Sequence, residues 1–123
     1  MDERALVDKW LSVFGEGVDK QIMKENVCAP CNYLWHVFTW GNVAALAGED
    51  ARRAFDALSY TEAIRFCDGY SCEIRDVSVV GRLSAENVET DGGRDVYITA
   101  TDFSWTYVRT HEEGLGPYLC VKK

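Results

Sequence analysis

Hydrophobic residues near the start of the chain recur at helical spacing. Within residues 3–14 they lie next to each other or three to four positions apart: Leu6, Val7, Trp10, Leu11 and Phe14. An α-helix brings such positions onto one face, because it completes a turn in about 3.6 residues. The pattern predicts an amphipathic helix over residues 3–14, which begins after Asp2 as the N-cap and ends at Gly15 and Gly17.

Two shorter segments follow this helix. Residues 18–26 carry few apolar side chains among charged ones, and we expect a second, short helix that ends before Pro30, since proline lacks a backbone N–H. Residues 33–40 read Tyr-Leu-Trp-His-Val-Phe-Thr-Trp and are dense in aromatic and β-branched side chains, which favour strands. The sequence therefore predicts a strand over residues 33–40.

Residues 49–58 show the clearest helical pattern in the chain. Ala51, Ala54, Phe55 and Leu58 fall on one face at a spacing of three or four residues. The two acidic residues at positions 49 and 50 lie at the N-terminal end, where the helix dipole favours negative charge.

From Tyr60 onward the hydrophobic period changes from helical to two. Residues 62–66 and 72–80 flank Asp68-Gly69, a turn signal, and predict a hairpin. Ser84 is a suitable cap for one helical turn over residues 85–88. Residues 95–99, 103–111 and 117–121 predict three short strands in a meander. The expected fold is a single α+β domain over residues 1–123, with N-terminal helices packed on a mainly antiparallel sheet that ends in a C-terminal β-meander.

The strand that follows Phe103 carries large rings on one face. Phe103, Trp105 and Tyr107 alternate with smaller residues, so their side chains share one side of the sheet together with Arg109. We expect this face to be core that the helices cover; the alternative is an exposed aromatic recognition surface.

Composition and charge narrow the class of protein. The chain has 123 residues, 47% of them hydrophobic, and its 13 basic and 20 acidic side chains give a net charge of −7. A general nucleic-acid binder is not expected, because such proteins concentrate Lys and Arg on one surface. The charged N-terminus does not resemble a signal peptide and no apolar stretch is long enough to cross a bilayer, so a cytosolic protein without membrane contact is predicted.

The cysteines allow three interpretations. Cys28 and Cys31 form a Cys-x-x-Cys motif that contains proline, and Cys67 and Cys72 are four residues apart in the predicted hairpin. A structural zinc site could use both pairs, while a redox dithiol could use the first. The favoured interpretation is that all of them, Cys120 included, are small buried hydrophobes, and no cofactor is expected.

The two histidines are the other candidates for chemistry. His36 lies in the aromatic segment, and His111 lies at the end of a predicted strand next to Glu112. If they converge with a carboxylate such as Asp102, they could form an acid–base pair or a metal site. The alternative for His36 is a packed ring that hydrogen-bonds the backbone.

Several short strings in order along the chain resemble one family. They are Leu34-Trp35-His36-Val37-Phe38, Gly48-Glu49-Asp50-Ala51, Asp95-Val96-Tyr97, Asp102-Phe103-Ser104-Trp105-Thr106-Tyr107-Val108, Thr110-His111-Glu112 and Gly116-Pro117-Tyr118. This pattern is similar to the bacterial family catalogued as domain of unknown function 4275, over about residues 33–120. The resemblance implies a small bacterial cytosolic protein and no particular reaction. It directs attention to these candidate binding residues: Trp35, His36, Asp102, Trp105, Thr110, His111 and Glu112.

The leading hypothesis for function is a non-enzymatic protein-binding module. An acidic surface speeds docking onto a basic protein partner, as when an immunity protein blocks a cationic toxin. The alternatives are an enzyme or small-ligand site around His36 and His111, and a structural zinc protein that uses Cys28, Cys31, Cys67 and Cys72.

Overall fold

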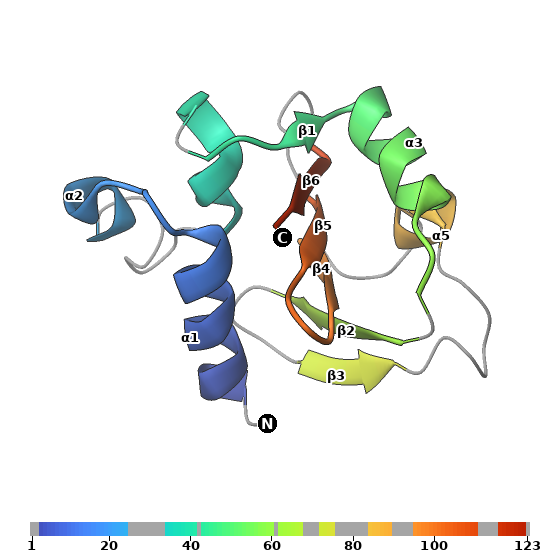
Figure 1. Cartoon of the computed structure of the whole chain (residues 1–123), viewed down its shortest axis with the longest axis horizontal. Helices are drawn as coiled ribbons and strands as arrows, with labels where there is room; N and C mark the ends of the chain where they lie inside the picture. Colours follow the sequence, from blue (N-terminus) through green and yellow to red (C-terminus); the bar gives the residue numbers. More distant parts are fainter. Residues whose placement is uncertain are drawn as a thin grey trace. The chain divides into compact units, whose positions relative to one another are not determined.

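A computed structural model of the chain describes residues 3–24, 34–41, 43–60, 62–67, 72–75, 84–89, 95–110 and 116–122 (Figure 1). The chain divides into two compact units, Met1–Ala44 and Ala45–Lys123, and each is described by itself. That the two units fold as a single domain stays a prediction. In the described residues, no helix is both long and apolar enough to cross a membrane.

The first unit begins with the predicted amphipathic helix, α1 (Glu3–Phe14). Leu6, Trp10 and Phe14 are buried, as their spacing predicts. The Trp10 ring centroid lies 5.4 Å from that of Phe14 and 5.8 Å from that of Phe38 in an edge-on contact. These rings form the aromatic core of the unit. The predicted cap, Asp2, lies outside the described residues.

The second predicted helix is confirmed as the short α2 (Lys20–Ile22). Asp19 is its N-cap, because one carboxylate oxygen accepts from the backbone amides of Gln21 and Ile22, at 2.9 and 3.4 Å. The helix is shorter than the predicted 18–26, of which residues 25 and 26 lie outside the described part.

The predicted strand over residues 33–40 is wrong, since Leu34–Gly41 forms a 3-10 helix, η2. Its buried apolar residues are Leu34, Trp35, Val37 and Phe38. A strand would place buried and exposed side chains in alternation, whereas these positions follow a helical period. The polar residues follow the same helical period. His36 and Thr39 are three positions apart, and the Thr39 hydroxyl contacts both the Nδ1 atom and the backbone carbonyl of His36. The prediction of a strand was wrong because it relied on the aromatic and β-branched content of the segment and not on the helical spacing of its apolar residues.

The second unit is built on an antiparallel sheet of six strands. Their order is β1-β6-β5-β4-β2-β3, and all neighbours are antiparallel. The strands are β1 (Leu46–Ala47), β2 (Ala63–Cys67), β3 (Cys72–Arg75), β4 (Val96–Ala100), β5 (Trp105–Arg109) and β6 (Tyr118–Val121). The predicted α+β class, the β2–β3 hairpin and the β4–β5–β6 meander are confirmed.

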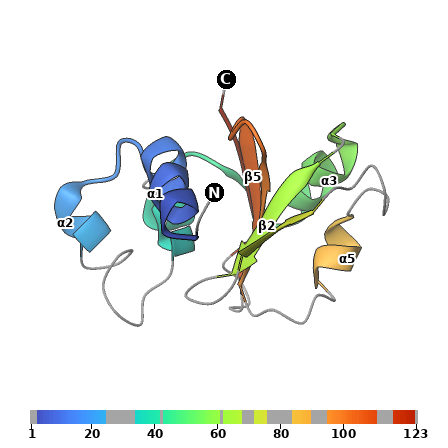
Figure 2. The same ribbon diagram turned by 90° about the horizontal axis from the view of Figure 1, so that it is seen from below.

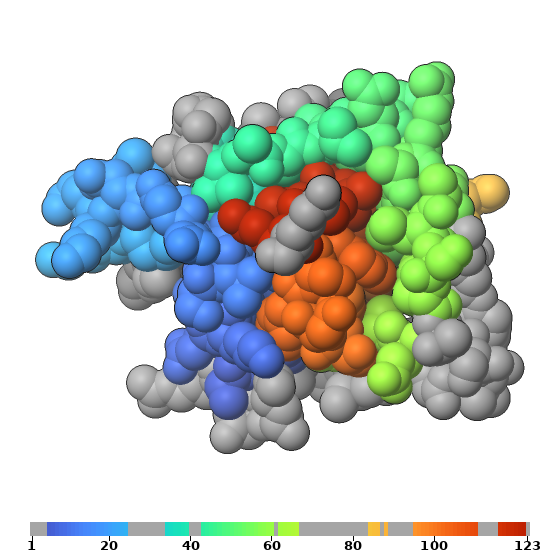
Figure 3. Space-filling view, in the orientation of Figure 1, coloured from blue at the N-terminus to red at the C-terminus, as the bar shows by residue number. Residues whose placement is uncertain are grey.

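Two helices lie on the same face of this sheet (Figure 2). The helix predicted over residues 49–58 forms α3 (Glu49–Ala57), and its residues Ala51 and Phe55 are buried. The single helical turn predicted over residues 85–88 forms α5 (Ala85–Glu89). The two are joined by a hydrogen bond, because the backbone amide of Ala85 donates to the Asp56 carboxylate at 2.8 Å. On the face shown in Figure 3, the yellow-green residues after α3 lie next to the orange β4–β5 segment.

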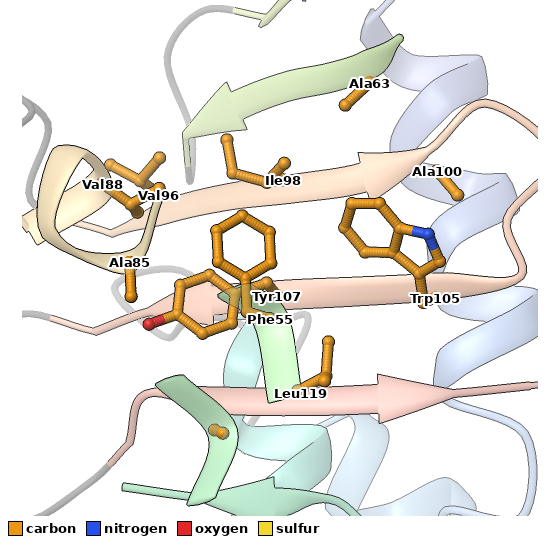
Figure 4. Close-up of a cluster of buried hydrophobic side chains, with 11 residues drawn as sticks. Phe55, Ala63, Ala85, Val88, Val96, Ile98, Ala100, Trp105, Tyr107 and Leu119 are labelled. Carbon is orange, nitrogen blue, oxygen red and sulfur yellow. The ribbon is translucent and has the colours of Figure 1, made fainter. Parts of the chain in front are cut away.

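The core between α3 and the sheet contains two of the three rings of the predicted aromatic face, Trp105 and Tyr107; the third, Phe103, lies in the turn before β5. Phe55 stacks on Tyr107 with ring centroids 4.1 Å apart and an interplanar angle of 10°, and meets Trp105 edge-on at 5.9 Å (Figure 4). Both strand residues are buried, Tyr107 completely. The prediction that a helix covers this face is therefore confirmed for α3.

The opposite face of the central strands contains a buried pair of threonines. The Thr99 and Thr106 hydroxyls are 2.9 Å apart, and Thr106 also donates to the Ile98 carbonyl at 3.4 Å. Neither threonine is exposed to solvent. Each hydroxyl therefore gives the other a partner that water cannot replace.

Replacing both members of this pair should cost less than the sum of the two single replacements. Thr106→Val leaves the buried Thr99 hydroxyl without its 2.9 Å neighbour, and we expect a loss of about 1–3 kcal/mol of unfolding free energy. In Thr99→Val/Thr106→Val no hydroxyl of the pair remains, so the loss should be well below the sum of the two single losses. Urea denaturation of all four proteins measures this coupling, and strictly additive losses would contradict it.

Candidate functional site

A pocket of about 230 Å³ lies at one end of the sheet in the second unit. It is formed by the β4–β5 turn and by the segment between α3 and β2. Its lining residues are Ser59, Tyr60, Glu62, Ala100, Thr101, Asp102, Ser104 and Trp105. Two of the sequence-predicted site residues, Asp102 and Trp105, therefore share one pocket.

The β4–β5 turn has an unusual backbone at Phe103. Its φ of +60° is in the left-handed region, which a bulky side chain occupies at a cost of about 1–2 kcal/mol. The ring is 3% exposed, and burial of a phenylalanine side chain contributes about 1.5–3 kcal/mol, which offsets the cost. Two backbone hydrogen bonds fix the turn. The Phe103 amide donates to the Ala100 carbonyl at 2.9 Å, and the Lys122 amide donates to the Ser104 carbonyl at 2.7 Å.

Asp102 is held in this turn as a carboxylate. One of its oxygens accepts from the Ser104 backbone amide at 3.0 Å. Hydrogen bonds from the Ser104 side chain, and then from that amide, lower the pKa of Asp102 below the ordinary 3.8. The residue is exposed, so its negative charge faces solvent and the pocket.

Removing the Ser104 hydroxyl should raise the pKa of Asp102 toward its ordinary value. We expect Ser104→Ala to keep the amide bond and to lose the larger of the two hydrogen-bonding effects. Because the folded-state pKa is lowered, these bonds stabilise the folded protein above pH 3.8, and that contribution is lost as pH falls through the folded pKa. A carboxyl ¹³C titration by NMR measures the shift, and an unchanged midpoint would contradict the assignment.

Aromatic rings form the apolar part of the pocket. The centroids of Tyr60 and Trp105 are 5.0 Å apart with an interplanar angle of 58°, and Phe55 stacks behind Tyr60 at 6.3 Å. Trp105 is 6% exposed and Tyr60 is half-buried. Packing against Phe55 fixes both rings, so the pocket is formed by rigid core residues on this side.

The charge of the pocket is negative. Asp102 and Glu62 contribute its carboxylates, and the described residues that line it include no Lys, Arg or His. The pairing of Ala63 with Ala100 places the residues before β2 and after β4 at the same end of the sheet, which brings the two acidic residues to one site. Carboxylates beside aromatic rings suit a cationic group, which gains both ion pairing and attraction to the ring quadrupole.

Other predicted site residues lie elsewhere. Thr110 follows the opposite end of β5 from the pocket, about five residues from Trp105 and so roughly 17 Å along the strand. His111 and Glu112 lie outside the described residues. Their part in a site stays a prediction.

Trp35 and His36 belong to the first unit, within η2. Trp35 is fully buried, and its ring centroid is 4.2 Å from that of the half-buried His36. The Thr39 hydroxyl donates to the His36 carbonyl at 3.0 Å and lies 3.2 Å from Nδ1. The hydroxyl and Nδ1 are within hydrogen-bond distance, and the tautomer of the ring decides which of the two donates.

The cysteines are only partly described. Cys28 and Cys31 lie outside the described residues, and Cys67 and Cys72 are strand residues whose backbones pair with Val96 and Phe66. Cys120 is a buried free thiol, and burial raises its pKa. Among the side chains that the structure describes, no group of three or more His, Cys, Asp or Glu could hold a metal ion. The zinc hypothesis stays a prediction.

Tyr60 and Glu62 are pocket residues that the sequence did not single out. They precede β2, a strand that pairs with β4 across an intervening hairpin and helix. Periodicity identifies strands but gives no partner for a strand that pairs with one distant in sequence. Their proximity to Asp102 therefore had no signal in the single sequence.

Comparison with protein-family models gives a match over most of the chain. A family model described as Domain of unknown function (DUF4275) matches residues 5–119. No curated protein and no solved structure matches the chain.

Proposed function

We propose that this chain, which belongs to the family described as Domain of unknown function (DUF4275), is a non-enzymatic module that binds a basic protein partner. The observation that carries the proposal is the pocket in which two carboxylates, Asp102 and Glu62, lie beside two packed rings, Tyr60 and Trp105. The site is proposed to act in the cytosol of a bacterium.

The size of the pocket supports a protein side chain as its occupant. Sites for small molecules and cofactors commonly measure about 300–1,000 Å³. The 230 Å³ measured here is below that range. A partner that places one side chain in the pocket, and contacts the surrounding surface with others, fits this volume better than a free cofactor.

The charge of the whole chain supports a basic partner. The net charge of −7 creates a field that attracts cationic proteins and raises their association rate. Inhibition of a cationic toxin by an immunity-like mechanism is one form that such binding could take. The Asp102 carboxylate, whose pKa is lowered, keeps its charge through the physiological pH range.

A salt-controlled pull-down tests this function. The immobilised full chain is incubated with an extract of its source organism at low ionic strength, and retained proteins are identified and purified. We expect a basic protein that binds the chain directly and whose affinity falls steeply as salt rises, because screening shortens the range of charge attraction. Failure of every purified candidate to bind directly, or an affinity independent of salt, would overturn the proposal.

A further inference from the structure

We propose that the pocket receives an arginine side chain of the partner, with the guanidinium group against the carboxylates of Asp102 and Glu62 and its flat face toward the ring of Tyr60, which packs on Trp105. This inference rests on the proposed function and deepens it, because it names the chemical group that the module recognises. It follows from the shape, the rings and the carboxylates of the pocket, taken in turn.

The volume fits one long side chain. At about 230 Å³ the pocket is smaller than the roughly 300–1,000 Å³ of sites for small molecules and cofactors. A single arginine side chain is an occupant smaller than such ligands. A peptide segment or a nucleobase with its sugar would exceed the pocket.

The rings favour a planar cation. Tyr60 and Trp105 meet at 58°, and because Trp105 is almost fully buried, the half-buried Tyr60 provides most of the aromatic wall that a ligand can reach. Guanidinium stacks on aromatic faces and is more weakly hydrated than ammonium, so it loses less hydration when it leaves water. Trp105 cannot turn to meet a ligand, because it is 6% exposed and packs edge-on against Phe55 at 5.9 Å. The ligand must therefore match a wall that already exists.

The carboxylates favour several donors in one plane. One Asp102 oxygen is oriented by the Ser104 amide at 3.0 Å, which directs the carboxylate without neutralising it. Guanidinium offers five N–H donors in a fixed fork and can contact two carboxylates at once, whereas lysine carries its charge at a single point. Both carboxylates are on exposed residues, so each ion pair with the guanidinium group contributes only the small binding energy of a surface salt bridge. The aromatic rings therefore supply the additional preference for arginine over lysine.

NMR titration of the ¹⁵N-labelled full chain tests this assignment with three blocked amino acids. N-acetyl-arginine-methylamide should shift the amide signals of Asp102 and Ser104 and the indole signal of Trp105. N-acetyl-lysine-methylamide should bind several-fold more weakly. N-acetyl-citrulline-methylamide, which is planar but neutral, should cause no shift at matched concentration. Equal shifts by arginine and lysine probes, or shifts confined to other residues, would overturn the inference.

Two matched variants separate this inference from the proposed function. Glu62→Gln/Asp102→Asn removes both pocket charges and keeps the side-chain shapes, and it should reduce the affinity for the arginine probe at least tenfold. Glu16→Gln/Asp50→Asn removes the same charge from exposed residues that do not line the pocket and should leave that affinity within twofold. If a basic partner binds both variants equally well, the proposed function stands and the arginine site is wrong. If the arginine probe binds but no basic protein does, the module function is wrong.

Discussion

Replacing Phe55 with alanine is expected to destabilise the protein by about 3–5 kcal/mol, the range for deletion of a fully buried aromatic ring. Phe55 is completely buried on α3 and contacts three other rings, those of Tyr107, Trp105 and Tyr60. Loss of the ring leaves a cavity between α3 and the sheet. It also removes aromatic contacts, which stabilise the protein beyond the effect of the buried apolar area. Denaturation in urea, followed by tryptophan fluorescence, measures the change.

The same substitution should also disturb the pocket. Because Phe55 supports both aromatic residues of the wall, we expect the Trp105 indole signal to shift even where Phe55→Ala remains folded. Phe55→Leu, which keeps most of the volume, should lose clearly less stability. Arg53→Ala, at an exposed position of the same helix, should change it by no more than about 0.5 kcal/mol. A loss below about 1 kcal/mol for Phe55→Ala would contradict the packing described for this core.

The second large effect is expected at Trp10 in the first unit. Trp10 is completely buried on α1 and contacts Phe14 and Phe38, so it links α1 to η2. We expect Trp10→Ala to cost about 3–5 kcal/mol of unfolding free energy. Trp10→Phe, which retains a ring, should cost less than half of that. Equal losses for the two variants would indicate that the ring contacts contribute little.

Trp10→Ala also tests the predicted single domain. If residues 1–123 unfold as one cooperative unit, amides of β4 and β5 should lose protection from hydrogen exchange by the same free energy as amides of α1. The exposed Lys9→Ala, one position earlier on α1, is the control. Protection that falls in residues 3–41 alone, with β4 and β5 unchanged, would show two independently folding units.

The sequence predicted elements well where one face alone had to be apolar. The helix that contains Phe55 shows this, since its apolar spacing and its two leading acids agree, and both follow from local physics. The meander was predictable for another reason, because short segments joined by tight turns pair with their neighbours, although β4 and β5 are buried on both faces. The 3-10 helix of residues 34–41 was missed because its aromatic and β-branched side chains favour strands, although the spacing of its buried residues follows a helical period.

The candidate site was predictable only in part. Asp102 and Trp105 are close in sequence, and a strand–turn pattern brings them together. Tyr60 and Glu62 complete the pocket through the pairing of β2 with β4, which no local pattern determines. The negative charge of the pocket comes from the segment before β2 and the segment after β4 together. The sequence alone could therefore suggest an acidic protein that binds a partner, but it could not locate the binding site.

The shortest strand of the sheet has a consequence for solubility. β1 covers β6 with only two residue pairs, Leu46 with Leu119 and Ala47 with Tyr118. An outer strand of this length offers few free backbone groups in a row, and a second molecule needs such a row to extend the sheet by hydrogen bonding. Directly after β1, Gly48 starts α3, with its amide bonded to the Pro117 carbonyl at 2.9 Å. The chain therefore leaves the edge of the sheet after two residues, so β1 is too short an edge strand to act as a template for aggregation.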